Sequence, residues 1–444
     1  MLLTEKEAKA VTDRILSFVK ADDASVSVSS DKLSHLRFAR NGFLTSGQRL
    51  GRGASVTLWI GGRRGASSTN DLDDASLKTM VEQAEQLARL APVDREYLPT
   101  LKAQTYKPTG GYVEATANVS PTIRAKAVSD ILNECEKSGV IGAGFHQARA
   151  NAGASATKNG NFEFERASAV SLSVTTRTQD GMSSGYFLRS HFDINRLDTM
   201  RVARESIRKT LEGKNARTLE PGSYTVILEP QAVADLLGSI SQGFNARNAD
   251  EGRSPYSAPG GKTRLGELIF DERISILSDP WNAEVPGSQS AQGGIPAQKI
   301  YLVKNGKLEN LTYNRFWAQK QSKEPTPGPV NTILEPNGKT STLEEMIAST
   351  KRGLIISRFW YIRSTDPRTA SLTGLTRDGV WFVENGKIQY PVKNFRFNQS
   401  IIQMLASGNV EMVGTPERVG EGNAALLPAL KLKSFNFTSQ SEAV

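Results

Sequence analysis

The side chains best suited to metal binding or nucleophilic catalysis are few in this sequence and far apart. The 444 residues contain three histidines, His35, His146 and His191, each more than forty residues from the next. A zinc site needs three or four ligands, usually at short spacings. The only cysteine, Cys135, lies on the apolar face of a predicted helix, so we expect a buried structural thiol. These residues predict neither a metal site nor a catalytic site on this chain.

A glycine-rich segment at 139–144, "GVIGAG", is similar to a phosphate-binding loop. Such a loop works because it leads into a helix whose first N–H groups face the phosphate. Here the glycines lead into a predicted strand. The segment therefore does not predict a nucleotide site.

One stretch lies where an active site is expected but carries almost no reactive side chain. Residues 235–246, "DLLGSISQGFNA", have helical spacing of apolar residues and follow a predicted strand, "SYTVILEP". Proteins with α/β units often bind ligands at such a strand-to-helix junction. The stretch either serves packing alone or marks a site that has lost its chemistry.

Hydrophobic periodicity and turn residues predict an α+β fold in several parts. A capping box of Thr4 and Glu7 begins a first helix, short alternating strands follow, and a second helix ends at Pro92. A comparable helix, strands and helix recur after a segment rich in proline and glycine. We predict an N-terminal α+β domain at 1–95, a linker at 96–119, a central α+β domain at 120–216 and a β-rich C-terminal domain at 217–444.

Two similar segments predict β-hairpins in the last part. They are "IYLVKNGKLENLT" at 300–312 and "VWFVENGKIQYPV" at 380–392. Asn-Gly between apolar runs favours a type I′ turn, because both central residues need positive φ. The hairpins indicate one large antiparallel sheet or barrel, with inserted helices such as "STLEEMIASTKRG".

Charge and hydropathy narrow the possible partners. The 55 basic and 46 acidic residues give a net charge of +9, but the basic residues are spread along the chain without a zinc finger or aromatic platform. We therefore disfavour a nucleic-acid partner. No apolar run approaches the roughly 18 residues of a membrane span, and the N-terminus lacks the layout of a secretory signal. We expect a cytoplasmic protein without a membrane partner.

Several segments together resemble the TldD/PmbA family, also called TldD/TldE, of peptide-maturation metalloproteases and proposed DNA-gyrase modulators. The resemblance covers roughly 220–440 and rests on order and spacing. Its segments are "YTVILEPQAVADLLGSI", "SPYSAPGGKTRLGELIFDERISILSDP", "IYLVKNGKLENLTYNRFWAQK", "TSTLEEMIASTKRGLII", "LTGLTRDGVWFVENGKIQYPVKNFRFNQS" and "LPALKLKSFNF". The N-terminal "FARNGF" and "GRGASV" are similar but less specific.

The resemblance implies where a metal site would be. In a TldD-type subunit the helix after "LL" carries H-E-x-x-x-H, and a later cysteine completes the zinc site. The matching positions here are Gly238, Ser239 and Gly243, and no cysteine follows Cys135. Glycine offers no side-chain ligand, so the resemblance is closest to the metal-free TldE/PmbA-type subunit.

The resemblance also implies a loop bordering a cavity. Its family-like positions here are Ser254, Leu265, Gly266 and Gly294. In the family an acidic motif stands where this chain reads "SAQGGIP", and of that motif only Gly294 is retained.

The leading hypothesis is a non-catalytic subunit of a TldD/TldE-type metalloprotease that acts on unfolded or extended peptides. Zinc is then expected only on a TldD-type partner carrying H-E-x-x-x-H, and this chain holds no cofactor. The alternative is a homodimeric peptide-binding or scaffold protein without protease activity. A DNA- or gyrase-associated modulator is a third reading, based on the charge and the family's older name. Whether this chain has any activity of its own is left open.

Overall fold

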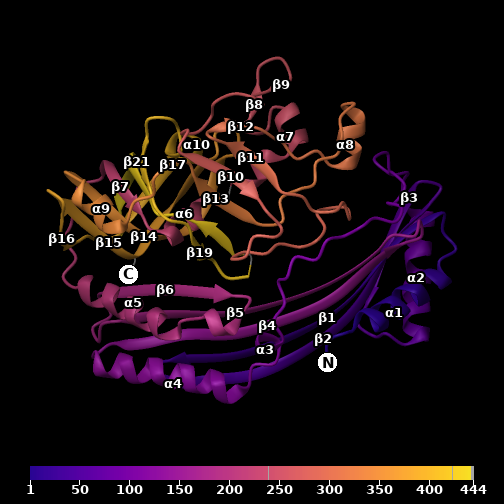
Figure 1. Ribbon diagram of the computed structural model, residues 1–444, viewed down its shortest axis with the longest axis horizontal. Coiled ribbons are helices and arrows are strands. Elements are labelled where there is room, and N and C mark those ends of the chain that lie inside the picture. Colours follow the sequence, from indigo (N-terminus) through magenta and orange to yellow (C-terminus); the bar gives the residue numbers. More distant parts are fainter. Residues whose placement is uncertain (239, 423, 442–444) are drawn as a thin grey trace.

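The computed structural model describes residues 1–238, 240–422 and 424–441. Three large sheets organise these residues. One is built from the first 191 residues, and two are built from the C-terminal part. In Figure 1 the C-terminal part, orange to yellow, lies above the long N-terminal sheet, with helix α4 below that sheet and helices α1 and α2 at its right end.

The N-terminal sheet has six antiparallel strands in the order β3-β2-β1-β4-β5-β6. The strands are β1 (Asp23–Ala39), β2 (Gly42–Ile60), β3 (Arg63–Thr69), β4 (Ile141–Thr157), β5 (Phe162–Arg177) and β6 (Ser184–His191). Strands β1 and β4 pair at the centre, from Ser25 with Thr157 to Phe38 with Gly144. The predicted units 1–95 and 120–216 therefore share one sheet instead of forming two separate ones, while their boundaries stay a prediction.

The same order of elements occurs twice around this central pair: a helix, three strands and a helix. The helices are α1 (Glu5–Phe18), α2 (Asp74–Leu90), α4 (Pro121–Lys137) and α5 (Thr199–Glu212). The short helix α3 (Glu114–Ala117) lies in the segment between the repeats. Helices α1 and α2 pack on one end of the sheet through Ile15, Leu77 and Val56. Helices α4 and α5 pack on the other end through Ile131, Ile207 and Leu172, which belong to one shared core.

Strands β1 and β2 are much longer than the short strands predicted from the sequence. They have 17 and 19 residues and are joined at Arg40 and Asn41, both with positive φ. Polar segments such as 29–32 lack the apolar alternation of a half-buried strand, so periodicity alone divides β1 into pieces. The backbone ladder continues through them because strand pairing does not depend on burial of every side chain.

The first C-terminal sheet closes on itself. Its order is β14-β7-β21-β17-β15-β16, and an additional pairing of β14 with β15 completes a ring of β14, β7, β21, β17 and β15. The strands are β7 (Gly222–Leu228), β14 (Arg352–Asp366), β15 (Ser371–Glu384), β16 (Lys387–Pro391), β17 (Phe395–Ser400), β18 (Val410–Val413) and β21 (Leu430–Gln440). Buried aromatic rings, among them Phe359, Phe397 and Phe435, pack together in its core.

The second C-terminal sheet has the order β12-β11-β10-β13-β20-β19. Its strands are β10 (Ile274–Ser278), β11 (Ile300–Lys304), β12 (Lys307–Leu308), β13 (Thr332–Pro336), β19 (Glu417–Val419) and β20 (Ala425–Leu427). Helices and a small hairpin lie in the segments between these strands: α6 (Pro230–Leu237), α7 (Ala246–Asp250), α8 (Arg315–Lys320), α9 (Leu343–Ala348), α10 (Ile401–Met404), β8 (Ser257–Ala258) and β9 (Lys262–Thr263).

Both predicted Asn-Gly hairpins are present. Asn305 and Gly306 connect β11 to β12, Asn385 and Gly386 connect β15 to β16, and all four have positive φ. The predicted strand-rich part with inserted helices is present, but it is divided between two sheets, and the two hairpins belong to different ones. Turn chemistry is local and can be read from the dipeptide, whereas sheet membership depends on distant partners.

No helix in the described ranges is both long and apolar enough to cross a membrane.

Candidate functional site

Helix α6 follows strand β7 and is shorter than the sequence predicted. It begins with Pro230 directly after Glu229 and ends at Leu237, with Gly238 as its C-cap in right-handed helical conformation. A 3-10 turn, Ser241–Phe244, and then α7 replace the expected continuation. Residues 235–246 are therefore not one helix.

The positions that the resemblance assigns to metal ligands do not form a site. Gly238 is exposed at the end of α6, and a Cβ there would meet only the Ala234 carbonyl oxygen, at 3.8 Å. Gly243 lies in the 3-10 turn, where a Cβ would be 3.2 Å from the Tyr256 ring. Ser239 lies outside the described residues. The two glycines therefore stand on different backbone segments, and neither offers a ligand atom from a side chain.

The four family-like loop residues are dispersed. The Ser254 hydroxyl donates to the Gly243 carbonyl at 2.6 Å, which fixes the 3-10 turn. Leu265 is exposed, and Gly266 has positive φ and donates its N–H to the Leu308 carbonyl. Gly294 lies elsewhere, where its carbonyl accepts from the Tyr106 hydroxyl at 2.7 Å. Among the described residues, Ser254 is the one loop residue with a hydrogen bond to a predicted metal-helix position, Gly243.

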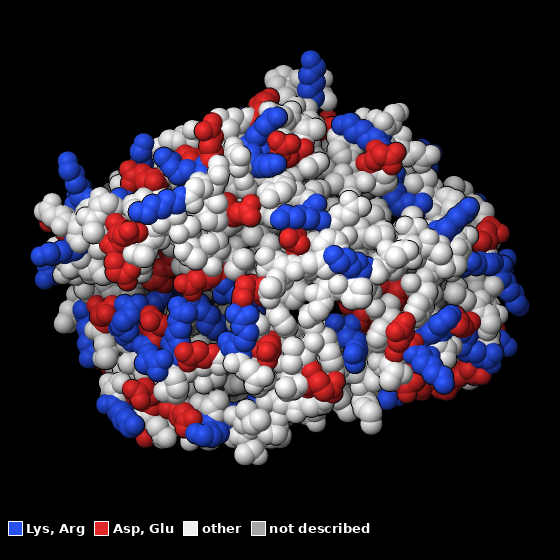
Figure 2. All heavy atoms as spheres, viewed as in Figure 1, with Lys and Arg blue, Asp and Glu red and all other residues white. Residues whose placement is uncertain are grey.

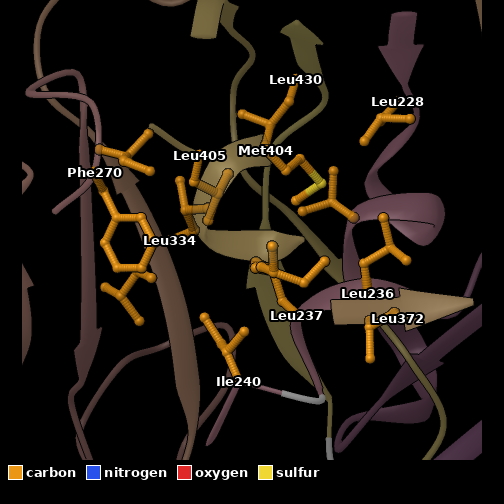
Figure 3. Packing of buried hydrophobic residues seen from close by; sticks show 14 of the residues in the cluster. Leu228, Leu236, Leu237, Ile240, Phe270, Leu334, Leu372, Met404, Leu405 and Leu430 are labelled. Carbon is orange, nitrogen blue, oxygen red and sulfur yellow. The ribbon is translucent and has the colours of Figure 1, made fainter. Parts of the chain in front are cut away.

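An apolar cavity lies beside α6, between that helix and the second C-terminal sheet. It has a volume of about 360 Å³, and we call it the α6 cavity. Its buried apolar walls include Leu237, Ile240, Phe244, Ile276, Leu302, Leu334 and Leu427. Figure 3 shows Leu237 and Ile240 directed into the same apolar space as Leu334. Volumes of this size are typical of small-molecule sites.

Two polar side chains of α6, Gln231 and Asp235, also border the α6 cavity. Gln231 Nε2 donates to Asp235 Oδ1 at 2.8 Å, and the Phe359 N–H donates to Asp235 Oδ2 at 2.8 Å. Burial raises the pKa of Asp235 to about 6, against these two hydrogen bonds and the charge of Arg358. Sequence reasoning missed both residues, although a spacing of four on a predicted helix places them on one face.

A larger hollow, of about 610 Å³, lies between the N-terminal sheet and the closed C-terminal sheet. Its buried carboxylate, Asp378, accepts from the Ser184 hydroxyl at 2.7 Å and lies 3.4 Å from Arg358. The polar groups Asp378, Ser184 and Arg358 already bind one another. The hollow therefore has fewer unpaired polar groups to bind a ligand than the α6 cavity has.

The histidines and the cysteine do not provide a metal site. Burial and the nearby Arg124 charge lower the pKa of His146 to about 4, and His191 Nδ1 already accepts from the Asp193 N–H at 2.9 Å. His35 lies beside Phe145 on the N-terminal sheet. Cys135 is buried. The described parts of the chain contain no group of three His, Cys, Asp or Glu residues able to hold a metal ion, so the donor set does not fit zinc.

Basic and acidic side chains are mixed over the face shown in Figure 2. On the most basic helix, α5, Arg208 pairs with Glu205 and Glu212, and Arg201 lies 3.3 Å from Glu417. These arginines are engaged in ion pairs within the chain, which is the arrangement of a solvated helix face and not of a phosphate-binding surface.

Family models match two parts of the chain. The PmbA/TldA metallopeptidase C-terminal domain matches residues 221–439, and PmbA/TldA metallopeptidase domain 1 matches residues 24–88. Together these ranges include more than half of the sequence.

Two curated proteins have related sequences. An uncharacterized protein of Methanocaldococcus jannaschii is 29% identical over 189 residues, which is 40% of this chain and 44% of that protein. A protein of Methanothermobacter thermautotrophicus named metalloprotease is 25% identical over 246 residues, 52% of this chain and 51% of that protein. The chain thus spans about half the length of the curated relatives it matches.

Solved structures with the same fold align over nearly the whole chain. A proposed modulator of a DNA gyrase from Thermotoga maritima has a TM-score of 0.85 at 17% identity, covering 97% of this chain and 100% of that one. TldE from Thermococcus kodakarensis has a TM-score of 0.84 at 17% identity, covering 97% and 99%. At such identities the likeness establishes the fold alone.

Proposed function

Because this chain belongs to the PmbA/TldD metallopeptidase family, we propose that it is the non-catalytic subunit of a TldD/TldE-type metalloprotease. One observation carries the proposal. The positions that the resemblance assigns to the two metal-binding histidines are Gly238 and Gly243, and helix α6 ends before it reaches either of them. The complex would act on unfolded or extended peptides, and its zinc would be bound by a TldD-type partner with H-E-x-x-x-H.

A free strand edge supports the need for a partner. Strand β2 pairs with β1 along one edge, and along its opposite edge it pairs with β3 only over 54–60. Among the described residues this second edge therefore has no partner strand over 42–53. Phe43, Leu44 and Leu50 are exposed along this edge, and Leu44 exposes 62% of its surface. Soluble proteins usually protect such edges, since unpaired N–H and C=O groups attract other strands. We propose that the TldD-type subunit covers this edge.

The first experiment measures metal and activity. The chain is purified alone and together with a TldD-type subunit, and zinc content and cleavage of an unfolded protein are measured for both. We expect one zinc per heterodimer, none on the isolated chain, and cleavage only by the complex. Stoichiometric zinc together with peptidase activity in the isolated chain would refute the proposal.

A matched pair of variants tests the edge. Leu44→Lys introduces a charge on the unpaired strand, whereas Leu90→Lys makes the same change at the end of α2, where Leu90 exposes 85% of its surface. We expect L44K to lose co-purification with the TldD-type subunit and L90K to retain it. Equal co-purification of both variants would exclude this edge as the contact.

A homodimeric scaffold is the second candidate, and the same edge favours it. A strand edge can pair antiparallel with its own copy about a two-fold axis, which gives a closed dimer. In that case the isolated chain has twice its monomer mass in light scattering, and L44K restores the monomer mass. A dimer that L44K leaves intact would show that another surface mediates self-association.

A further inference from the structure

Two residues that line the α6 cavity, Gln231 and Asp235, keep hydrogen-bond acceptor capacity that the described residues do not use. Gln231 Oε1 is buried and has no hydrogen-bond partner among the described residues. Among the described residues, no lysine or arginine lies within 4 Å of the Asp235 carboxylate to form an ion pair with it. The charge of Arg358 acts on Asp235, but its guanidinium lies 3.4 Å from Asp378 and 3.9 Å from the centre of the Tyr186 ring.

The hydrogen bonds of Asp235 explain why the Gln231 oxygen is unpaired. An ionised carboxylate accepts only, so Gln231 must present Nε2 to it. The amide oxygen of Gln231 then has to point elsewhere, and Asp235 keeps further lone pairs because each of its oxygens accepts one bond. A carboxylate and an amide oxygen at one cavity wall form a site for a group with several N–H donors.

The apolar part of the cavity wall restricts which kind of molecule can bring these N–H donors into the cavity. Ile240, Phe244 and Leu334 are almost fully buried and have no polar side-chain atom to offer a ligand. A hydrated inorganic cation would leave these walls facing water, whereas an apolar substituent gains from their burial. The chemistry therefore favours an organic cation with a compact apolar tail.

We propose that the α6 cavity binds an apolar group that bears an ammonium, such as the free amino end of a peptide that begins with an aliphatic or aromatic residue. The ammonium donates to Asp235 and Gln231 Oε1, and the apolar side chain fills the space next to Leu237 and Ile240. The inference rests on the proposed function, in which this subunit contributes a binding cavity without a metal.

Calorimetry with the full chain tests the chemistry at neutral pH. The probes are L-leucinamide, N-acetyl-L-leucinamide, which lacks the ammonium, and isopentylamine, which lacks the peptide-like amide. We expect L-leucinamide to bind and the acetylated probe to bind at least about tenfold more weakly. Isopentylamine distinguishes a simple amine from a peptide amino end as the ligand. If it binds as tightly as L-leucinamide, a simple amine is sufficient. If it binds more weakly, the ligand is a peptide amino end.

Three variants locate the binding. Asp235→Asn removes the charge, its Oδ1 can still accept from the Phe359 N–H, and its NH2 can donate to Gln231 once the Gln231 amide turns over, so it should fold and lose at least about tenfold in affinity. Gly238→Trp adds bulk at the cavity wall where a Cβ meets nothing closer than 3.8 Å, so it should abolish binding. Asp130→Asn, an exposed charge on α4, is the matched control and should bind like the wild type.

The inference is overturned if L-leucinamide does not bind at about 10 mM, or if the acetylated probe binds with equal affinity. Wild-type affinity in both D235N and G238W would show that the ligand binds elsewhere. These outcomes are independent of the metal measurement. Zinc and peptidase activity in the isolated chain would refute the proposed function while leaving the amine measurements interpretable.

Discussion

Substitution of Lys209 should reduce the free energy of unfolding more than substitution at most other positions, because Lys209 forms a buried ion pair between the two halves of the protein. Lys209, on α5, lies 2.5 Å from Glu229, the residue before α6, and their side chains are 3% and 12% exposed. Lys209 Nζ also contacts the Ser357 hydroxyl, which donates to Glu229 at 3.0 Å. Three elements, α5, α6 and β14, therefore meet at one charge pair.

The magnitude follows from what each substitution leaves behind. Lys209→Met keeps most of the side-chain volume but leaves the Glu229 carboxylate buried with only a hydroxyl partner. Breaking a buried pair in this way costs about 3–5 kcal/mol. The double variant Lys209→Met/Glu229→Gln removes both charges, so it should recover part of that loss. The non-additivity, about 1–3 kcal/mol, measures the coupling of the pair.

Urea unfolding provides the assay. Trp59 reports on the N-terminal sheet, whereas Trp281, Trp317, Trp360 and Trp381 report on the C-terminal part, so variants without Trp59 separate the two signals. Coincident transitions in fluorescence and circular dichroism are required before a free energy is extracted. In K209M we expect the coincident transitions to move together to lower urea, because loss of the pair leaves the Glu229 carboxylate buried without its cation.

The control is an exposed pair of the same chemistry. Lys126 and Asp130 are 2.8 Å apart on α4, and their side chains are 75% and 43% exposed. Lys126→Met should cost no more than about 0.5 kcal/mol. A loss below about 1 kcal/mol in K209M, or equal losses in K209M and K126M, would refute the reasoning that burial makes the Lys209 pair costly to break.

Three further predictions concern single sites. Burial raises the pKa of Asp235 to about 6, above its unfolded value of roughly 4. The protonated carboxyl therefore favours the folded state, and the free energy of unfolding falls as the pH rises from about 4 to about 6. Asp235→Asn should therefore be more stable than the wild type by about 1–2 kcal/mol at pH 7.5 and lose this advantage near pH 4, measured by thermal unfolding. Burial raises the pKa of Cys135 to about 11, so a maleimide should label it at least about a hundredfold more slowly in native buffer than in denaturant; equal rates would contradict its burial. Gly65→Ala would place a Cβ 2.0 Å from the Ala84 carbonyl oxygen and should cost several kcal/mol, whereas Gly53→Ala meets nothing closer than 3.4 Å and should cost much less in the same assay.

The features that could be predicted from the sequence are those fixed by neighbouring residues. The capping boxes of Thr4 with Glu7 and of Thr342 with Glu345 are present, because each motif is complete within four residues. The Asn-Gly turns at 305–306 and 385–386 follow from the same local logic. The α+β class is confirmed for the same reason, since it needs only the types of the elements and not their partners.

The features that could not be predicted depend on distant contacts. The pairing of β1 with β4 joins residues more than a hundred positions apart, and nothing in either strand specifies the other. The end of α6 was missed because a glycine in helical conformation does not signal a stop. Packing of Gly243 against Pro255 and Tyr256, and the hydrogen bond from Ser254, fix the backbone beyond α6 in a 3-10 turn.

The 3-10 turn after α6 shows that more than two side chains separate this segment from a metal-binding helix. A helix that merely carried glycines in place of histidines could regain ligands by two substitutions, since its side chains would still project from one regular helix. Here a side chain at 243 would have to displace the Tyr256 and Pro255 rings, which lie 3.2 and 3.3 Å from its Cβ position. Leu236, Leu237, Ile240 and Phe244 meanwhile remain buried, so the core around the stretch is maintained. In its described residues the protein has the walls of a cavity and no geometry for a metal, and this combination supports the proposal of a subunit that binds or encloses a substrate while a partner cleaves it.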